Sequence, residues 1–129
     1  MLTHDNLTSN ARTLAAYWRF TKDDVLLHPL PVFHTHGLFV ATNTILLSGG
    51  SILLLPKFDI SEMLRLMPQA TVMMGVPTHY LRLLATSTFT RDIARGMRLF
   101  ISGSAPLPRN TMGKIQKKHM REIYKDTYN

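Results

Sequence analysis

The amino-acid sequence predicts an α/β fold built on a four-stranded, mainly parallel sheet with flanking helices. Short runs rich in apolar residues alternate with longer segments in which apolar residues recur at helical spacing. Turns containing glycine or proline separate these segments. Strands that alternate with helices require right-handed crossovers, which make successive strands parallel. The chain has 129 residues, 45% of them hydrophobic, which is enough for one modest domain with a core.

The first helix is expected to begin after Thr3, whose hydroxyl can cap it, and to run to about Phe20. A short apolar run over 25–31, with prolines at its end, is typical of a buried strand. Residues 36–47 are mostly apolar and predict a helix packed on the sheet. The glycines at 49 and 50 end that helix, because glycine tolerates the positive φ found there.

The remaining strands are expected over 51–55, 71–75 and 97–102, with helices over 60–67 and 77–85 between them. Pro77 suits the first position of its helix. The composition changes after Leu107, where a polar, turn-like segment precedes a basic amphipathic helix over 114–128. We therefore expect two units, residues 1–107 and residues 108–129.

The charge of the chain is concentrated at its C-terminal end. Residues 107–129 carry six basic and two acidic side chains, which give +4 of the total +7. Such a segment can contact phosphate groups on nucleic acid or on a nucleotide, or it can be a solvated helix face. The chain has no cysteine, which excludes disulfides and thiolate metal sites and is compatible with the cytoplasm. Residues 1–5 do not read as a signal peptide, and no apolar run is long enough to cross a membrane.

Two histidines follow the first predicted strand. Ligands in open α/β folds gather at the carboxyl ends of strands, so His34 could line a pocket or gate a tunnel there. No third ligand with suitable spacing accompanies His34 and His36, so no metal site is predicted. For His36 we expect structural capping or polar packing in the core.

Small residues follow the last predicted strand, over 102–106. They allow a ligand such as a flat adenine ring to approach the backbone closely, although similar turns occur in many proteins without a ligand. The segment is not a phosphate loop, because the GxxxxGK[ST] and GxGxxG patterns are absent from the chain.

Two cationic side chains are candidates for anion binding. Lys114 lies beside a glycine turn and could reach a phosphate or carboxylate as a point charge. Arg82 lies on an otherwise apolar helix and could bind a carboxylate through two hydrogen bonds. Taken by residue type alone, each could equally be an ordinary surface residue.

Five segments together resemble one family. Residues 1–7, 30–39, 74–80 and 99–107 are similar to the acyl-CoA synthetase branch of the adenylate-forming, AMP-binding enzymes. The HTHG segment (34–37) and the SGSAPL segment (102–107) resemble malonyl-CoA synthetases most, and PRNTMGKIQK (108–117) resembles the end of their C-terminal domain. The resemblance implies the use of ATP, Mg²⁺ and CoA to convert malonate into malonyl-CoA, with release of AMP and pyrophosphate.

The resemblance also implies roles for individual residues. A cationic anchor suits a malonate-like dicarboxylate, because burying its second charge unpaired would be costly. The implied catalytic residue is Lys114; the implied substrate-binding residues are Arg82, His34 and Ser102; the implied adenine-nucleotide-binding residues are Ser104, Ala105 and Pro106.

The order of these motifs differs from that of the family. There, a long stretch with the magnesium-binding glutamate, the ribose-binding aspartate and the hinge separates SGSAPL from PRNTMGK. Here the two segments join at about Leu107–Pro108, and the family's phosphate loop would precede Met1. We therefore expect a partial AMP-binding N-terminal domain (1–107) with a remnant of the C-terminal domain tail (108–129), inactive alone. The alternative is a non-catalytic module that binds adenine nucleotide or a full-length synthetase; nucleic-acid binding is not expected.

Overall fold

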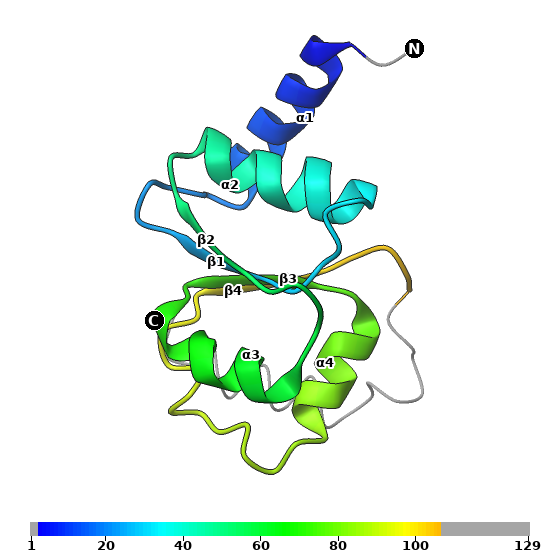
Figure 1. Cartoon of the computed structure of the whole chain (residues 1–129). Coiled ribbons are helices and arrows are strands. Elements are labelled where there is room, and N and C mark those ends of the chain that lie inside the picture. The colour runs from blue at the N-terminus through cyan, green and yellow to red at the C-terminus, as the bar shows by residue number, and fades with distance from the viewer. Residues whose placement is uncertain (1–2, 107–129) are drawn as a thin grey trace.

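The computed structural model describes residues 3–106 of the chain (Figure 1). The predicted basic helix over 114–128, and with it Lys114, lies outside the described residues.

A parallel sheet of four strands forms the centre of the described part. The strands are β1 (Val25–His28), β2 (Ser51–Leu54), β3 (Val72–Gly75) and β4 (Leu99–Ser102), in the spatial order β2-β1-β3-β4. All three neighbouring pairs are parallel. The predicted α/β class and strand number are confirmed, and the sheet is parallel throughout.

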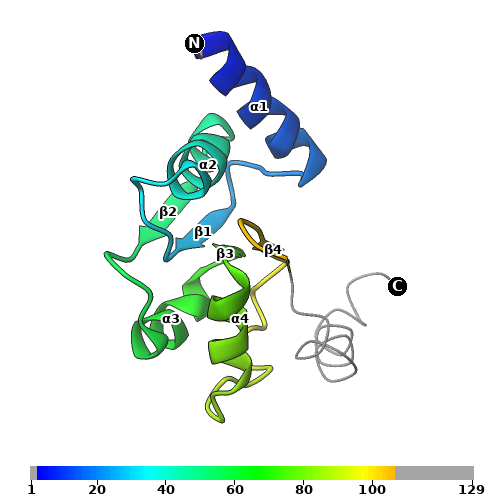
Figure 2. The ribbon, with the colours of Figure 1, turned by 90° about the vertical axis from the view of Figure 1, so that its right-hand side faces the viewer.

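Helices cover both faces of this sheet. On one face lie η1 (His36–Thr42) and α2 (Asn43–Leu47), with α1 (His4–Tyr17) packed against them. The other face carries α3 (Ile60–Leu66), η2 (Met67–Gln69) and α4 (Pro77–Leu84). Figures 1 and 2 show the sheet between these two helical layers. None of the helices in residues 3–106 combines the length and the apolar character needed to cross a bilayer.

Local sequence signals explain where the helices begin. The Thr3 hydroxyl accepts a hydrogen bond from the Asn6 amide at 3.2 Å, and the Asn6 side chain accepts one from the Thr3 amide at 3.0 Å. This reciprocal pair is a capping box and fixes the start of α1, as predicted. Asp59 caps α3 in the same way, accepting from the Glu62 amide at 3.0 Å.

The single helix predicted over 36–47 is two elements in the structure. Residues 36–42 form a π-helix, in which the Asn43 amide bonds to the Leu38 carbonyl five residues earlier, and an α-helix follows. The carbonyl of Gly37 accepts hydrogen bonds from the Thr42 hydroxyl at 2.8 Å and from His28 Nε2 at 2.9 Å. These two side chains tie the first turn of the π-helix to the end of β1 and to its own last residue.

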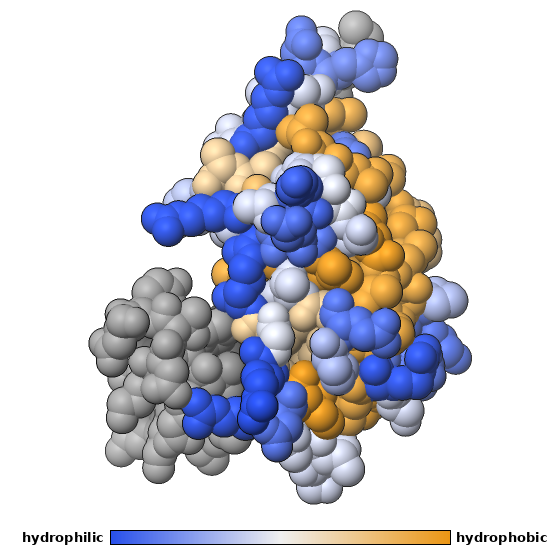
Figure 3. All heavy atoms as spheres, turned by 90° about the vertical axis from the view of Figure 1, so that its left-hand side faces the viewer, coloured by the Kyte–Doolittle hydropathy of each residue, from blue (hydrophilic) through white to orange (hydrophobic). Residues whose placement is uncertain are grey.

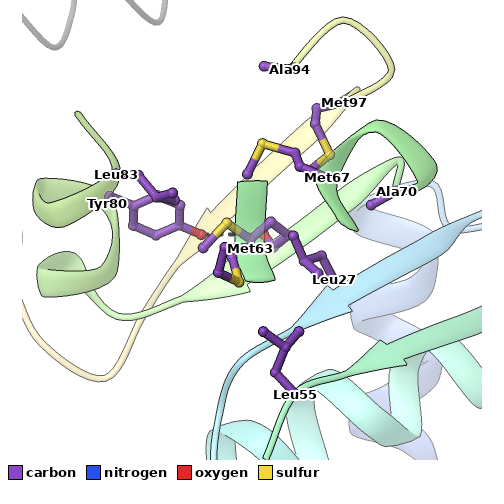
Figure 4. Packing of buried hydrophobic residues seen from close by; sticks show 10 residues of the cluster. Leu27, Leu55, Met63, Met67, Ala70, Tyr80, Leu83, Ala94 and Met97 are labelled. Atoms are coloured by element: carbon purple, nitrogen blue, oxygen red, sulfur yellow. Dashed lines mark hydrogen bonds between the residues drawn. The ribbon is translucent and has the colours of Figure 1, made fainter. Parts of the chain in front are cut away.

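The core has two parts, one on each face of the sheet. Along β3, Val72 and Met74 pack towards α2, whereas Met73 packs towards α3 and α4, because successive side chains of a strand point to opposite faces. Figure 4 shows the part that faces α3 and α4, in which Met67 lies beside Met97, and Met63 lies near Tyr80.

An ion pair ties the amino-terminal edge of the sheet together. Arg98 binds Asp24 through two hydrogen bonds of 2.6 Å each, and it also donates to the carbonyls of Trp18 and Arg19 at 3.2 Å. Asp24 accepts further from the Thr71 hydroxyl at 2.8 Å. This cluster joins the end of the α1 region to the starts of β1, β3 and β4.

Candidate functional site

The four parallel strands all end at one edge of the sheet, which we call the carboxyl edge. The end strand residues Gly75 and Ser102 are neighbours in register, and the Gly103 amide donates to the Gly75 carbonyl at 3.1 Å. The segments that follow the strands therefore lie close together, as expected for an open α/β fold.

His36 joins two of these segments. Its Nδ1 lies 2.9 Å from the hydroxyl oxygen of Ser104, which is 68 residues later in the chain. A Cβ atom at Gly103 would lie 3.0 Å from His36 Cε1, so the absence of a side chain there lets the imidazole lie against the loop. Ser104 itself has a φ of +66°, a left-handed conformation that is uncommon for serine.

The buried side chain of His28 supports the turn that carries His36. The Leu30 amide donates to His28 Nδ1 at 3.2 Å, so the ring proton lies on Nε2, which donates to the Gly37 carbonyl. Burial lowers the pKa of His28, and the ring is neutral at physiological pH. Burial also lowers the pKa of His36, and the nearby His28 contributes in the same direction.

A second group of side chains joins α4 to the connection between β2 and α3. The His79 imidazole stacks on the Phe58 ring with centroids 4.2 Å apart and an angle of 11° between the planes. The Arg82 guanidinium carbon lies 5.0 Å from the centroid of the same ring. Burial lowers the pKa of His79 to about 4, with smaller contributions from Arg82 and His36. His79 therefore stays neutral beside the permanent charge of Arg82.

The sequence-predicted site residues within 3–106 belong to three segments of the chain, whereas Lys114 lies outside the described residues. Arg82 is exposed on α4, and His34 is exposed on the loop before η1, with its ring 4.6 Å from that of Phe33. The exposed end of β4 and the loop after it carry Ser102, Ser104, Ala105 and Pro106.

The structure adds three residues that the sequence analysis did not select as site residues. His36 contacts Ser104 directly, whereas we had expected capping or core packing for it. Phe58, from the β2–α3 connection, packs against both His79 and Arg82 of α4. His36 lies in the same HTHG segment as His34, and this shared segment was the one available signal.

The described part of the edge offers neutral imidazoles, hydroxyl groups and one guanidinium. These groups can donate to carboxylate or phosphate oxygens. Over residues 3–106, no three side chains of His, Asp or Glu come close enough to hold a metal ion. The described side chains at this edge are thus chiefly hydrogen-bond donors, which suit an anionic group.

Comparison with known proteins assigns the family. Residues 1–128 match the family described as "AMP-binding enzyme". The chain belongs to this family. Among curated relatives, the malonate–CoA ligase of Arabidopsis thaliana is 36% identical, over 85% of this chain and 21% of the relative.

Solved structures agree with this assignment. The ATP-bound MatB of Rhodopseudomonas palustris superposes with a TM-score of 0.83 at 60% identity, covering 86% of this chain and 22% of MatB. A malonyl-CoA ligase in a ternary product complex with methylmalonyl-CoA and AMP gives a TM-score of 0.73 at 38% identity, covering 81% of this chain and 24% of that one. The resemblance to malonyl-CoA synthetases is confirmed, and this AMP-binding family member spans about a fifth of the length of its curated relatives.

Proposed function

We propose that this chain is part of an acid–CoA ligase of the malonyl-CoA synthetase type, and that its carboxyl edge supplies one side of the substrate site. The observation that carries the proposal is the hydrogen bond between His36 and Ser104. It joins the HTHG and SGSAPL segments, which are the two that most resemble malonyl-CoA synthetases, at the edge where ligands bind in open α/β folds.

The proposed reaction joins malonate to CoA at the expense of ATP, with release of AMP and pyrophosphate. Arg82 and Ser102 would bind the distal carboxylate, and His34 would line the pocket. Arg82 suits this role because it is exposed and has no ion-pair partner within residues 3–106. A guanidinium can donate two parallel hydrogen bonds to one carboxylate. A dicarboxylate can offer its distal carboxylate for this contact while the other carboxylate reacts, whereas a simple fatty acid has no second carboxylate to offer.

The adenine of ATP would lie against Ser104, Ala105 and Pro106. The small, exposed side chains of this loop fit a flat ring that contacts the backbone. A magnesium ion does not fit the described residues, because they hold no suitable cluster of ligands, and we assign it no residue. The family's reaction also uses CoA, for which we assign no residue either.

We further propose that residues 1–107 are a partial N-terminal domain, that 108–129 are a remnant of the C-terminal tail, and that Lys114 is the adenylation lysine. The direct junction of SGSAPL with PRNTMGK supports this division. Phosphoryl chemistry depends on groups positioned around the phosphates. The family's stretch with the magnesium-binding glutamate is missing at this junction, so we expect that the chain alone does not complete the reaction.

A pyrophosphate-release assay with malonate, ATP, Mg²⁺ and CoA tests this proposal. The expected result is no release above background from the purified chain, with the MatB of Rhodopseudomonas palustris as the positive control. NMR titrations should show malonate shifting the signals of Arg82 and ATP shifting those of residues 102–106. Release that disappears in Lys114→Ala would disprove inactivity, and titrations without shifts would disprove the site assignment.

A second candidate function is a non-catalytic module that associates with a full-length synthetase. Leu46 and Leu47 of α2 and Leu54 of the edge strand β2 are 59%, 47% and 56% exposed. Figure 3 shows the apolar surface on the right-hand side of that view, where α2 and β2 lie. Such a surface is often an interaction site.

Light scattering on a mixture of this chain with the Rhodopseudomonas palustris MatB tests the second candidate. A complex that is lost in Leu54→Lys supports it, and the absence of a complex contradicts it.

We propose a cytoplasmic location, with which the absence of cysteine is compatible. Because the mouse malonate–CoA ligase is named as mitochondrial, fractionation of cells that express a tagged chain provides the test.

A further inference from the structure

Phe58 occupies a special place beside the carboxyl edge. It lies in the connection between β2 and α3, yet its ring contacts two side chains of α4, His79 and Arg82. These two residues are one helical turn apart on α4, so a single ring can contact both. Phe58 is therefore the link between the β2–α3 connection and the candidate carboxylate-binding arginine.

The backbone around Phe58 is anchored on both sides. Before it, the Leu55 amide donates to the His28 carbonyl at 3.0 Å, which continues the pairing of β2 with β1. After it, Asp59 caps α3 through its bond to the Glu62 amide. The Phe58 side chain is partly buried and packs against the core on the α3 and α4 face. The ring thus has a fixed position that does not depend on Arg82.

The guanidinium of Arg82, in contrast, contacts the ring of Phe58. Arg65 and Arg98 are each bound to a carboxylate. Within residues 3–106, Arg82 has no such partner, and its guanidinium lies over an aromatic ring. A cation–π contact orients a guanidinium while leaving its N–H groups free to donate to a ligand.

We infer that Phe58 is a positioning residue for Arg82: its ring, held in the β2–α3 connection and stacked on His79, orients the guanidinium at the carboxyl edge for carboxylate binding. That the ligand is a carboxylate rests on the function proposed above. The orientation of Arg82 by Phe58 rests on the observed contacts alone.

The state of His79 fits this arrangement. Burial against Phe58 favours the uncharged ring, and Arg82 lowers the pKa of His79 further. A protonated imidazole stacked on the same ring would repel Arg82 and compete for the negative face of the aromatic system. A neutral His79 extends the flat surface and adds no competing charge.

NMR of the whole chain without ligand tests the orientation directly. The Arg82 Nε–H signal, assigned with Arg82→Lys, is expected to carry a ring-current shift from Phe58. The shift should disappear in Phe58→Leu, which keeps an apolar side chain but removes the ring, and should remain in Phe58→Tyr. Phe89→Leu is the matched control, because Phe89 packs against the same core cluster and should leave the signal unchanged.

Malonate titration then tests the consequence for binding. The affinity is expected to fall about two- to five-fold in Phe58→Leu, the change that corresponds to an exposed cation–π contact, and to be restored in Phe58→Tyr. The dissociation constant for propionate, which lacks the second carboxylate, should change little. A structural role alone would weaken both ligands equally.

The possible outcomes separate the inference from the proposed function. An Arg82 signal that is unchanged in Phe58→Leu, or that shifts equally in Phe89→Leu, overturns the inference. A ring-dependent signal in a chain that does not respond to malonate supports the orientation by Phe58 and overturns the proposed ligand. If Phe58→Leu does not fold, Phe58→Met replaces it with the same expected loss of the shift.

Discussion

Replacing Asp24 should remove the interaction that holds the amino-terminal edge of the sheet together. The Asp24 side chain is 3% exposed and receives both hydrogen bonds of the Arg98 fork. It also accepts from the Thr71 hydroxyl and from the Thr21 amide, each at 2.8 Å. Asp24→Ala therefore leaves a guanidinium and two other donors without their acceptor.

The structure sets the size of the expected loss. Breaking a fully buried ion pair by removing one partner costs about 3–5 kcal/mol, because the other charge stays buried. The Arg98 side chain is 34% exposed, so water can solvate part of its charge after the change. We therefore expect Asp24→Ala to lower the free energy of unfolding by about 2–3 kcal/mol. Asp24→Asn keeps one acceptor oxygen and should cost about 1–2 kcal/mol.

Urea unfolding followed by the fluorescence of Trp18, the single tryptophan, provides the assay. With a typical dependence on urea, Asp24→Ala should lower the midpoint by about 1 M or more. Asp23→Ala is the control, because Asp23 is adjacent to Asp24 in sequence but is exposed. This control should leave the midpoint nearly unchanged. Equal midpoints for wild type and Asp24→Ala would refute the reasoning.

The same pair makes a prediction about pH. Burial alone would raise the pKa of Asp24, but hydrogen bonds from Arg98, Thr21 and Thr71 lower it below the ordinary 3.8. A carboxyl group with a depressed native pKa stabilises the fold above its unfolded pKa and loses that contribution as the pH falls through the native value. The stability difference between wild type and Asp24→Asn should therefore shrink below about pH 3.8; a difference that grows there would contradict the assignment.

Three further substitutions test the packing of the fold by urea unfolding. Gly37→Ala would place a Cβ against the backbone carbonyl oxygen of Pro31, well inside van der Waals contact. A loss of about 3 kcal/mol is therefore expected, and an unchanged midpoint would contradict this close approach. Tyr80→Phe removes a hydroxyl that donates to the carbonyls of two neighbouring strands, with an expected loss of about 1–2 kcal/mol; an unchanged midpoint would count against these bonds. Thr3→Ala removes the capping box of α1 and should cost about 1 kcal/mol, with faster hydrogen exchange confined to the first turn of α1.

Much of the fold could be predicted from local patterns. The capping threonine, the proline at the start of α4 and the four apolar runs gave the correct elements, with ends shifted by a few residues. The π-helical turn was not predicted, and one contact at this turn is a hydrogen bond from the His28 side chain to the Gly37 carbonyl, nine residues away. Hydrophobic periodicity carries no information about such a side-chain contact.

The position of the candidate segments in the fold could be predicted in part, whereas the roles of their residues stay predictions. The segments that contain His34, Arg82 and 102–106 do lie around the carboxyl edge. The contacts that organise this edge, His36 with Ser104 and Phe58 with Arg82, join residues far apart in the chain. Residue type alone does not distinguish these four residues from similar residues nearby in the sequence. The two pairs therefore could not be predicted before the positions of the helices and strands were known.

The sequence by itself determined the family, the α/β class and the order of the elements, because these depend on motifs and on patterns within single segments. The tertiary structure decided the strand order β2-β1-β3-β4 and the pairs of side chains that meet. It also showed that the Arg82 guanidinium lies over the Phe58 ring, whereas Arg98 is bound to the buried carboxylate of Asp24. The physical reason is that the burial of a charge, and the partner that satisfies it, depend on neighbours brought together only by folding.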